Sequence, residues 1–342
     1  MKALLVMRQG DPVAPNVEPG EAADPVPAAG EVLVRTEASA LNHLDLWVGR
    51  GLPGIDFTYP RWGGSDGCGR VEAVGTGVDE AWIGRRVIMN AAKPKPDPVQ
   101  PDLAPAPPDV SMIGEHELGA HAERFVVPAA NVLDVGDADP VEAAAFGLTH
   151  LTAWRMLVTR AGVRAGDSVL ITGIGGGVAL AALGICRHLG CRTIVTSRHA
   201  AKLERARELG ADETILDEGE DWSRAVRGAT GRRGVDVCVD SVGRAIHASC
   251  VKSLRRGGTF VTCGCTTGPA ATTDLARIFW SQLRLVGSTM GDMDEMRQVT
   301  SLFRAGHLRP VIDAVYDVAD GRRAYERLEA GEQFGKLVIR WT

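Results

Sequence analysis

The sequence predicts an α/β protein whose second half forms a parallel, doubly wound sheet and whose first half forms a compact β unit. From position 165 onward, short apolar runs alternate with amphipathic stretches of about ten residues, the length that a crossover helix between parallel strands requires. Residues 1 to 130 instead show β-branched runs separated by Gly and Pro, which is typical of an antiparallel, barrel-like unit with few helices.

The expected elements follow one another in order. The run "DSVLITG" (167 to 173) stops in glycine, and "VALAALGICRHLG" (178 to 190) then has helical periodicity and a terminal Gly. The alternation of strands and helices continues in the runs "CRTIVTSR", "AAKLERARELG", "GVDVCVDSVG", "TFVTCGC" and "RLVGSTMG". In the first half we expect strands at "EVLVRTEASAL", "CGRVEAVG", "RRVIMN" and "AERFVVP", and the chain closes in another strand, "QFGKLVIRW".

Composition excludes several classes of protein. The 342 residues are 45% hydrophobic and 24% charged, which fits a packed protein with a large core. A net charge of -5 and scattered arginines argue against nucleic-acid binding. No apolar run reaches membrane-spanning length, and "MKALLVMRQGDPVAP" lacks the pattern of a signal peptide. We therefore expect a cytoplasmic protein with a small-molecule substrate and no membrane or nucleic-acid partner.

The seven cysteines are an odd number, and nearly all lie in apolar stretches, so buried free thiols are expected. Cys263 and Cys265 form a C-x-C pair, but two thiols without a second pair are a weak metal signal. A structural role is the expectation for this pair, and no metal site is predicted.

A glycine turn carries the first chemical signal. In "ITGIGGGVALAA", Gly173, Gly175 and Gly177 let the strand turn into a helix whose amides can face a pyrophosphate, and small Ala179 allows close packing. The turn lies between an expected strand and an expected helix, which is the context that supports a Rossmann dinucleotide site. A glycine turn without a ligand is the alternative.

The end of the next strand indicates which nicotinamide cofactor is bound. An Asp or Glu there would bind a ribose 2′-hydroxyl, whereas this chain has Thr196, Ser197 and Arg198, with Lys202 one turn later. These groups suit a 2′-phosphate, so we expect NADPH. The alternative is a solvated basic face at a helix start.

The whole chain resembles the medium-chain dehydrogenase/reductase superfamily. The resemblance rests on "SDGCGRVEAVGTGV", "AAAFGLTHLTAW", the glycine turn, "DSVG", "LRLVGSTM" and "FGKLVI". It implies a GroES-like catalytic domain at 1–150, to which 281–342 return, and a Rossmann NADP-binding domain at 151–280. It also implies that the cofactor is contacted by Thr152, Gly176, Val178, Ser241, Val242, Gly264 and Lys336.

The resemblance also allows the catalytic zinc positions of the family to be compared with this sequence. Its three ligands fall on Asn42, Ser65 and Leu148, with Asp66 in the acidic place, and Leu44 replaces a proton-relaying hydroxyl. Zn²⁺ prefers three or four Cys, His or carboxylate donors, so this set resembles the zinc-free, quinone oxidoreductase-like branch. One alternative is a rebuilt metal site in "GEHELGAH", from Glu115, His116, Glu117 and His121.

The segment at residues 91–110 holds seven of the eighteen prolines and no cysteine. In the zinc alcohol dehydrogenases that the chain resembles, a lobe with four cysteines binds a structural zinc at this place. We expect proline to stiffen the segment instead of a metal, because a fixed φ lowers the entropy of an irregular chain. A disordered tether is the alternative.

Without a metal, a carbonyl must be polarised by hydrogen bonds. Near the expected nicotinamide the candidates are His43, Asp45, Ser65, Asp66 and His150. Asp45 matches an orienting position and is expected to be structural. His43 either donates a hydrogen bond to pyrophosphate or substrate, or packs in the interior. The same two alternatives stay open for His150. Ser65 and Asp66 are expected to line the emptied zinc pocket.

The sequence therefore favours a zinc-independent NADPH-dependent oxidoreductase that transfers a hydride to a quinone or an α,β-unsaturated carbonyl. Two alternatives stay open: an alcohol dehydrogenase or carbonyl reductase, and an NADPH-binding protein without turnover. We also expect a homodimer, because "TFVTCGC" and "LRLVGSTM" would place a sheet edge where it can pair with its two-fold mate.

Overall fold

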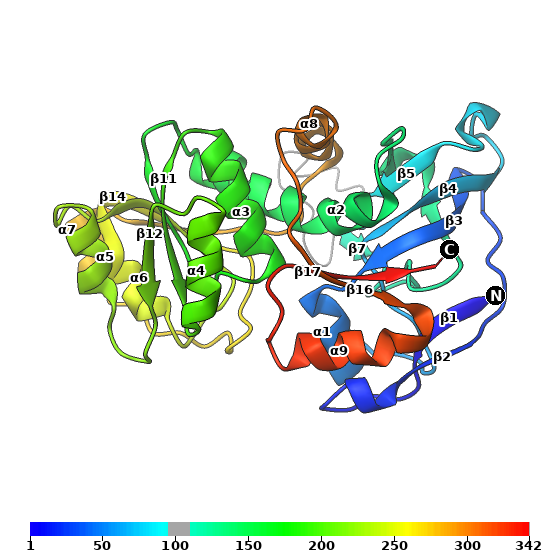
Figure 1. The fold of residues 1–342 in the computed structure, drawn as a ribbon, viewed down its shortest axis with the longest axis horizontal. Coiled ribbons are helices and arrows are strands. Elements are labelled where there is room, and N and C mark those ends of the chain that lie inside the picture. The colour runs from blue at the N-terminus through cyan, green and yellow to red at the C-terminus, as the bar shows by residue number, and fades with distance from the viewer. Residues whose placement is uncertain (95–109, 342) are drawn as a thin grey trace. The chain divides into compact units, whose positions relative to one another are not determined.

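The computed structural model describes residues 1–94 and 110–341. The chain forms two compact units (Figure 1): unit 1 comprises Met1–Leu148 with Met290–Thr342, and unit 2 comprises Thr149–Thr289. Both fold types expected from the sequence are present, a largely antiparallel β unit and a unit with a parallel, doubly wound sheet.

Unit 1 is built on a seven-stranded sheet in the order β16-β17-β3-β4-β5-β9, with β8 also paired to β3. The pairs are antiparallel except β16–β17, which is parallel. Its strands are β3 (Glu31–Ala40), β4 (Gly67–Val74), β5 (Arg86–Met89), β8 (Arg124–Pro128), β9 (Val132–Asp134), β16 (Ile312–Asp317) and β17 (Lys336–Arg340).

Smaller elements complete unit 1. Two further antiparallel pairs join β1 (Lys2–Val6) to β2 (Val17–Glu21) and β6 (Ala92–Pro94) to β7 (Val110–Met112). The α-helices are α1 (His43–Arg50), α8 (Met293–Arg304), α9 (Gly321–Glu329) and the first part of α2 (Pro140–Trp154), and the 3₁₀ turns are Ala14–Asn16, Glu80–Trp82, Ala129–Asn131 and Val318–Asp320.

The core of unit 1 explains why β3 forms where it does. Val32, Val34 and Thr36 alternate with more exposed residues and are buried, which is the period of a strand with one face against a core. Phe125 and Val127 of β8 pack into the same cluster. The apolar faces of these strands thus fix the frame that carries the polar residues described below.

Unit 2 is a six-stranded sheet, parallel throughout, in the order β12-β11-β10-β13-β14-β15. Helices α3 and α4 cover one face and α5 and α6 the other (Figure 1). The strands are β10 (Ser168–Ile171), β11 (Arg192–Ser197), β12 (Glu213–Leu216), β13 (Val235–Asp240), β14 (Leu254–Thr262) and β15 (Arg284–Gly287). The helices are α3 (Gly177–His188), α4 (Ala200–Glu208), α5 (Ser223–Ala229), α6 (His247–Ser253), α7 (Leu275–Ser281) and a π-helix at Arg155–Ala161.

Two details differ from the sequence-based expectation. The chain returns to unit 1 at Met290 instead of residue 281, because β15 is the sixth strand of the Rossmann sheet. The run "TFVTCGC" does not form a sheet edge, because β14 is paired on both sides; β15 alone is the edge on that side.

The proline-rich segment is only partly described. Its flanks pair as β6 and β7, and residues 95–109, on which the stiffening hypothesis depends, lie outside the described residues. Among the helices that the structure describes, none has the length and apolar character needed to cross a membrane.

Candidate active site

Asp66, at the N-terminal side of β4, is the centre of a buried polar cluster in unit 1. Its carboxylate accepts hydrogen bonds from Leu148 N (2.7 Å), Asn42 Nδ2 (2.9 Å) and Lys336 Nζ (2.9 Å). Lys336 also donates to Asn42 Oδ1 at 2.6 Å. We call these four residues the Asp66 cluster. A buried carboxylate with three donors, one of them a cation, is well compensated for its loss of solvent.

Strand pairing brings Lys336 into this cluster. The antiparallel register pairs Val338 with Ala40 and Arg340 with Ala38, so Lys336 stands opposite Asn42 at the next step. Lys336 is only 4% exposed and Asp66 1%, so their contact is a buried ion pair. The sequence assigned Lys336 to the cofactor. In the structure Lys336 Nζ donates hydrogen bonds to Asn42 and Asp66. A contact between Lys336 and the cofactor stays a prediction.

Close backbone approach is needed at Gly147. A Cβ built on this residue of α2 would lie 2.6 Å from Asp66 Oδ1, closer than such atoms can approach. Glycine therefore allows α2 to approach the carboxylate closely enough for Leu148 N to donate to it.

Asp45, on α1, organises a second part of the site. Its carboxylate accepts from Asn42 N (2.8 Å) and Gly64 N (3.0 Å), which ties the start of α1 to the loop before β4. Burial acts to raise the pKa of Asp45, but nearby His121 and the two amides outweigh burial and leave that pKa below its usual value. These contacts support the orienting role expected for Asp45.

His121 is buried beside Asp45, with its Nε2 3.3 Å from Asp45 Oδ1 but outside hydrogen-bond geometry. On the other side of the ring, Nδ1 lies 2.8 Å from Ser39 Oγ, and Ser39 Oγ accepts from Trp341 Nε1 at 2.9 Å. If Ser39 donates to Nδ1, the imidazole proton resides on Nε2 and faces Asp45. This Ser, His and Asp arrangement is enclosed, so it supports the fold of the site and is not a nucleophilic triad.

The residues at the family's zinc positions do not fit a zinc ion. Leu148 has no donor atom in its side chain, Ser65 Oγ donates to Ile113 O at 2.7 Å, and both polar atoms of the Asn42 amide are hydrogen-bonded within the Asp66 cluster. The Lys336 ammonium beside Asp66 adds a positive charge that would repel a metal cation. Ser65 and Asp66, expected to line an open pocket, are each 1% exposed and already bonded.

Of the alternative metal donors in "GEHELGAH", Glu115 and His116 lie close together, with His116 Nδ1 3.5 Å from Glu115 Oε1, but Glu117 and His121 have other partners. Glu117 binds Lys93 (2.5 Å) and Ser111 (2.8 Å), whereas His116 Nδ1 accepts from Met112 N at 3.2 Å. His121 lies in the interior with Ser39 and Asp45. Within residues 1–94 and 110–341, no group of three or more His, Cys, Asp or Glu could hold a metal ion.

His43 begins α1 next to Asn42 and is half-buried. Its ring meets Trp47 edge to face, with ring centroids 5.3 Å apart. Burial, assisted by the charge of Arg50, lowers the pKa of His43 below its usual value, so the imidazole is neutral at neutral pH. A neutral imidazole offers one donor and one acceptor.

The glycine turn of unit 2 has the geometry that the sequence predicts. Gly173 and Gly175 adopt φ of +63° and +117°, and α3 then begins at Gly177 after Gly176. Ile174 N donates to Thr196 O at 2.8 Å, which ties the turn to β11. The following Val178 is half-buried in the first turn of α3.

A second turn, "DSVG", lies against the glycine turn. Asp240 accepts from Thr172 Oγ1 (2.7 Å), Val242 N (3.0 Å) and Gly243 N (3.0 Å). Burial raises the pKa of Asp240 despite these three donors. A Cβ on Gly173 would lie 2.8 Å from Val242 Cγ2, and one on Gly264 would lie 3.1 Å from Ser241 O. The structure thus brings Gly173, Ser241, Val242 and Gly264 together.

At the end of β11 the expected phosphate-binding groups differ in their exposure to solvent. Ser197 is buried, and its Oγ accepts from His199 N at 3.1 Å, so the hydroxyl is already used in the turn that precedes α4. Arg198 is exposed and Lys202 half-buried. His150 and Thr152, on the part of α2 in unit 2, are buried, and Thr149 Oγ1 lies 3.4 Å from His150 Nδ1.

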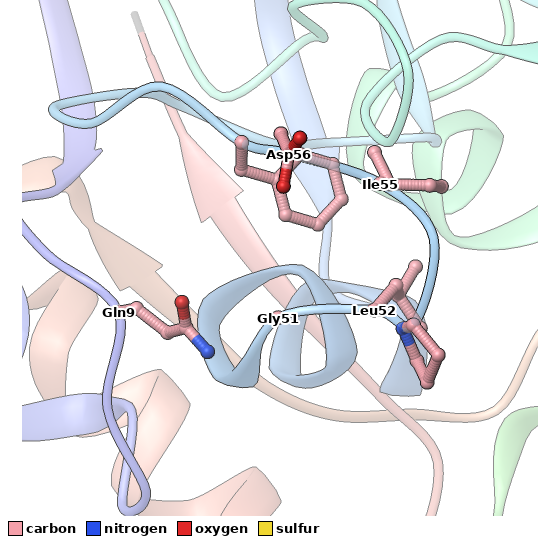
Figure 2. Close-up of a pocket in the computed structure, with 7 residues that line it drawn as sticks. Gln9, Gly51, Leu52, Ile55 and Asp56 are labelled. Carbon is pink, nitrogen blue, oxygen red and sulfur yellow. The ribbon is translucent and has the colours of Figure 1, made fainter.

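Figure 2 shows a shallow hollow of unit 1 beside the end of α1, with Gln9 directed toward Gly51 and with Ile55 and Asp56 on the loop opposite. Its volume is about 410 Å³. None of the candidate catalytic residues lines it: the lining residues are Gln9, Gly51, Leu52, Pro53, Ile55, Asp56 and Phe57. The hollow is therefore separate from the Asp66 cluster.

Comparison with known proteins decides the family. The model described as "Alcohol dehydrogenase GroES-like domain" matches residues 28–137, and "Zinc-binding dehydrogenase" matches residues 177–305. The chain is 32% identical to a "Zinc-type alcohol dehydrogenase-like protein YogA" of Leptosphaeria maculans, over 92% of each chain. The chain belongs to the medium-chain dehydrogenase/reductase superfamily.

Other members of this superfamily are also similar over nearly the whole chain. A solved "NAD-dependent alcohol dehydrogenase" superposes with a TM-score of 0.92 at 35% identity, covering all of both chains. A quinone oxidoreductase of Rattus norvegicus is 25% identical over 99% of this chain and 97% of its own length. The resemblance inferred from the sequence is confirmed, and the chain is an oxidoreductase of the medium-chain type.

The sequence alone did not reveal which residues of the site hydrogen-bond to one another. It gave Lys336 no partner, treated His121 only as a possible metal donor, and did not single out Ser39 or Trp341. The available signal was the register of a closing strand in which one Lys interrupts an apolar run, "FGKLVI".

Proposed function

We propose that this chain is a metal-independent, NADPH-dependent reductase that transfers a hydride to a quinone or another α,β-unsaturated carbonyl compound. The observation that carries the proposal is the Asp66 cluster. The positions of the family's zinc ligands hold Asn42, Ser65 and Leu148, and hydrogen bonds to Lys336, Ile113 and Asp66 engage the polar groups there. A metal would have to displace a buried ion pair, which is costly.

A conjugated acceptor suits a site without a metal. When bound, reduced nicotinamide supplies a hydride that would form a C–H bond at the β-carbon, and conjugation lets the electrons of the C=C bond shift so that negative charge develops on the carbonyl oxygen. Protonation then completes the product, so NADPH, a proton and the enone give NADP⁺ and the saturated carbonyl compound. The chain must position the acceptor and donate hydrogen bonds to its oxygen.

Among the candidate residues, His43 is best suited to donate. It is half-buried, neutral because burial lowers its pKa, and carried by a helix whose first turn Asp45 fixes. Ser65 and Asp66 are enclosed and bonded, so their proposed part is to hold Asn42 and the backbone in place. His150 remains a second candidate donor.

The preference for NADPH rests on β11 and α4. The strand ends at Ser197, Arg198 follows it, and no Asp or Glu stands at the position that would bind a ribose 2′-hydroxyl. Exposed Arg198 can form a bidentate pair with a 2′-phosphate, and Lys202 adds a second charge. Ser197 Oγ already accepts from His199 N, so Arg198 carries most of the expected selectivity.

The names of two relatives favour a second candidate, an alcohol dehydrogenase or carbonyl reductase. It predicts oxidation of alcohols by NADP⁺ or NAD⁺, and no preference for conjugated acceptors. The enclosure of Ser65 and Asp66 favours a third, an NADPH-binding protein without turnover.

Two assays separate the three: NADPH consumption with quinones, enones, enoyl thioesters and aldehydes, and NADPH formation from NADP⁺ with alcohols. Turnover confined to conjugated acceptors supports the proposal. Turnover confined to aldehydes and alcohols supports the second candidate. NADPH binding with no turnover on the whole panel supports the third.

A further inference from the structure

Two segments that each hold two consecutive arginines meet at the edge of the unit 2 sheet where its strands begin. Residues 231–234, "GRRG", lead directly into β13, and residues 255–258, "RRGG", lie in the first part of β14. The two strands are parallel neighbours, and Val235 is paired with Leu254, so the segments stand side by side. We call these eight residues the arginine segments. The glycine turn at residues 173–177 follows β10 and therefore lies at the opposite edge of the sheet.

A buried carboxylate, Asp236 of β13, holds one arginine of each segment. It accepts hydrogen bonds from Arg233 Nη2 at 2.5 Å and from Arg255 Nε, and each guanidinium contacts a different oxygen. Ser168 N donates to the same carboxylate at 2.9 Å, and the side chain of Asp236 is only 6% exposed. A carboxylate carries one negative charge, so Asp236 compensates only one of the two guanidinium groups.

Arg227, at the end of α5, connects the two segments. Its Nη1 donates to Leu254 O at 2.9 Å, and its Nη2 donates to Arg232 O at 2.7 Å. A Cβ built on Gly234 would lie 2.8 Å from Arg227 Nη1 and 2.7 Å from Arg255 N, so only glycine allows this close approach. Both acceptors of Arg227 are uncharged carbonyls, and its positive charge is therefore not neutralised.

The remaining two arginines are exposed. In the part of the chain that the structure describes, the guanidinium groups of Arg232 and Arg256 have no hydrogen-bond or ion-pair partner. Arg232 also has a φ of +67°, a conformation that glycine adopts readily and that strains a residue with a Cβ. Local structure therefore does not explain an arginine at this position.

Acidic residues around the arginine segments have partners of their own. Asp167, just before β10, accepts from Arg164 N at 2.8 Å, and Asp221, just before α5, pairs with Lys252 at 2.8 Å. Among the described residues, Asp236 is the one carboxylate that contacts Arg227, Arg232, Arg233, Arg255 or Arg256. Five guanidinium groups beside one carboxylate leave four positive charges, in a chain whose net charge is -5.

We propose that the arginine segments bind an anion with adjacent phosphate groups, at a site separate from the expected dinucleotide site. A phosphate group offers several acceptor oxygens and up to two negative charges, and the planar guanidinium fork matches two of those oxygens at once. Two or three adjacent phosphates supply the negative charge that Asp236 does not. Because hydrogen bonds already hold Arg227, Arg233 and Arg255, these side chains lose little freedom when such an anion binds.

Isothermal titration calorimetry of the folded full-length chain with inorganic tripolyphosphate tests the proposal. Each titration is made with and without saturating NADPH, and we expect one tripolyphosphate per chain in both. Arg232→Gly combined with Arg256→Ala removes two exposed charges, and glycine adopts a positive φ without strain, so the fold should be retained. We expect this variant to bind tripolyphosphate at least about tenfold more weakly. Arg224→Ala combined with Arg304→Ala removes two exposed charges elsewhere and should leave binding unchanged.

A second arm of the experiment identifies the source of the phosphates. The protein is sedimented with vesicles of phosphatidylcholine that contain a bisphosphorylated inositol lipid. Sedimentation that Arg232→Gly with Arg256→Ala abolishes would assign the phosphates to a lipid headgroup. Binding of tripolyphosphate without sedimentation would assign them to a free anion.

Four results would overturn the proposal. Loss of tripolyphosphate binding when NADPH is present would place the anion in the dinucleotide site. Equal weakening in the two double variants would show a general effect of net charge. Citrate bound as tightly as tripolyphosphate would show that the arginine segments do not distinguish phosphate from carboxylate. Binding of neither tripolyphosphate nor the vesicles would show that the segments hold no phosphate.

Discussion

The Lys336 ammonium lies 2.9 Å from the Asp66 carboxylate, although 270 residues separate them in sequence. Both side chains are buried, and Asn42 bonds to both. The pair lies beside Asn42 and Leu148, two of the positions at which zinc-dependent members of the superfamily hold their ligands. A substitution of Lys336 or Asp66 is therefore expected to affect both the stability of unit 1 and its chemistry.

Removing one partner of this pair should destabilise the protein strongly. Lys336→Met leaves Asp66 buried without its cation, and such a change costs about 3 to 5 kcal/mol of unfolding free energy. Urea unfolding measures it. The matched control is Lys336→Met combined with Asp66→Asn, which removes both charges and should recover part of the loss. Equal losses for single and double variants would contradict the ion-pair account.

Acid should destabilise the protein partly through Asp45. Its folded-state pKa is lowered from the usual value of 3.8, so its stabilising effect is present above that value and is lost as pH falls through the folded-state pKa. As pH falls from about 4 through the folded-state pKa, the unfolding free energy should fall more steeply for wild type than for Asp45→Asn. Parallel curves for the two proteins would show that Asp45 does not contribute.

Arg198→Ala should weaken NADPH binding by roughly tenfold to a hundredfold and barely change NADH binding, because a charge-assisted hydrogen bond contributes about 1.5 to 3 kcal/mol. Dissociation constants for both cofactors at two salt concentrations measure it. Arg224→Ala removes an exposed charge from α5 and serves as the control for net charge. Equal losses for NADH and NADPH in Arg198→Ala would instead give Arg198 a role in the fold or at the adenine.

We propose a homodimer formed through the edge strand β15. Its free edge can pair with the same strand of a second copy, and α7 just before it exposes Leu275, Phe279 and Trp280, the last at 72%. Light scattering at micromolar concentration should give twice the chain mass, and Leu285→Pro, which removes an amide that faces away from β14, should give a monomer with the fold retained. A wild-type monomer would contradict this.

The fold could be predicted from the sequence because its signals are local. The strand and helix periods and the glycine turn of residues 173 to 177 depend on neighbours in sequence, and Gly173 and Gly175 have the positive φ that such a turn needs. The second domain boundary was less accessible, because "RLVG" has the same pattern in either unit, and only pairing with β14 assigns it to the Rossmann sheet.

The site could be predicted only in part. Residue types at Asn42, Ser65 and Leu148 were enough to doubt a zinc ion. They could not show that Asp66 would accept from Leu148 N, since that bond depends on the approach of α2 that Gly147 permits. Likewise Ser197 was expected to bind phosphate, but a local hydrogen bond from His199 N competes for the same oxygen.

The most direct test of the central claim is NADPH oxidation by protein that has been dialysed against a strong chelator and analysed for metals. The Asp66 cluster predicts that such protein contains much less than one zinc per chain, keeps its fold, and reduces a quinone or an enone at the rate of the untreated protein. One tightly held zinc per chain, or activity that disappears with the chelator and returns with added zinc, would contradict the account.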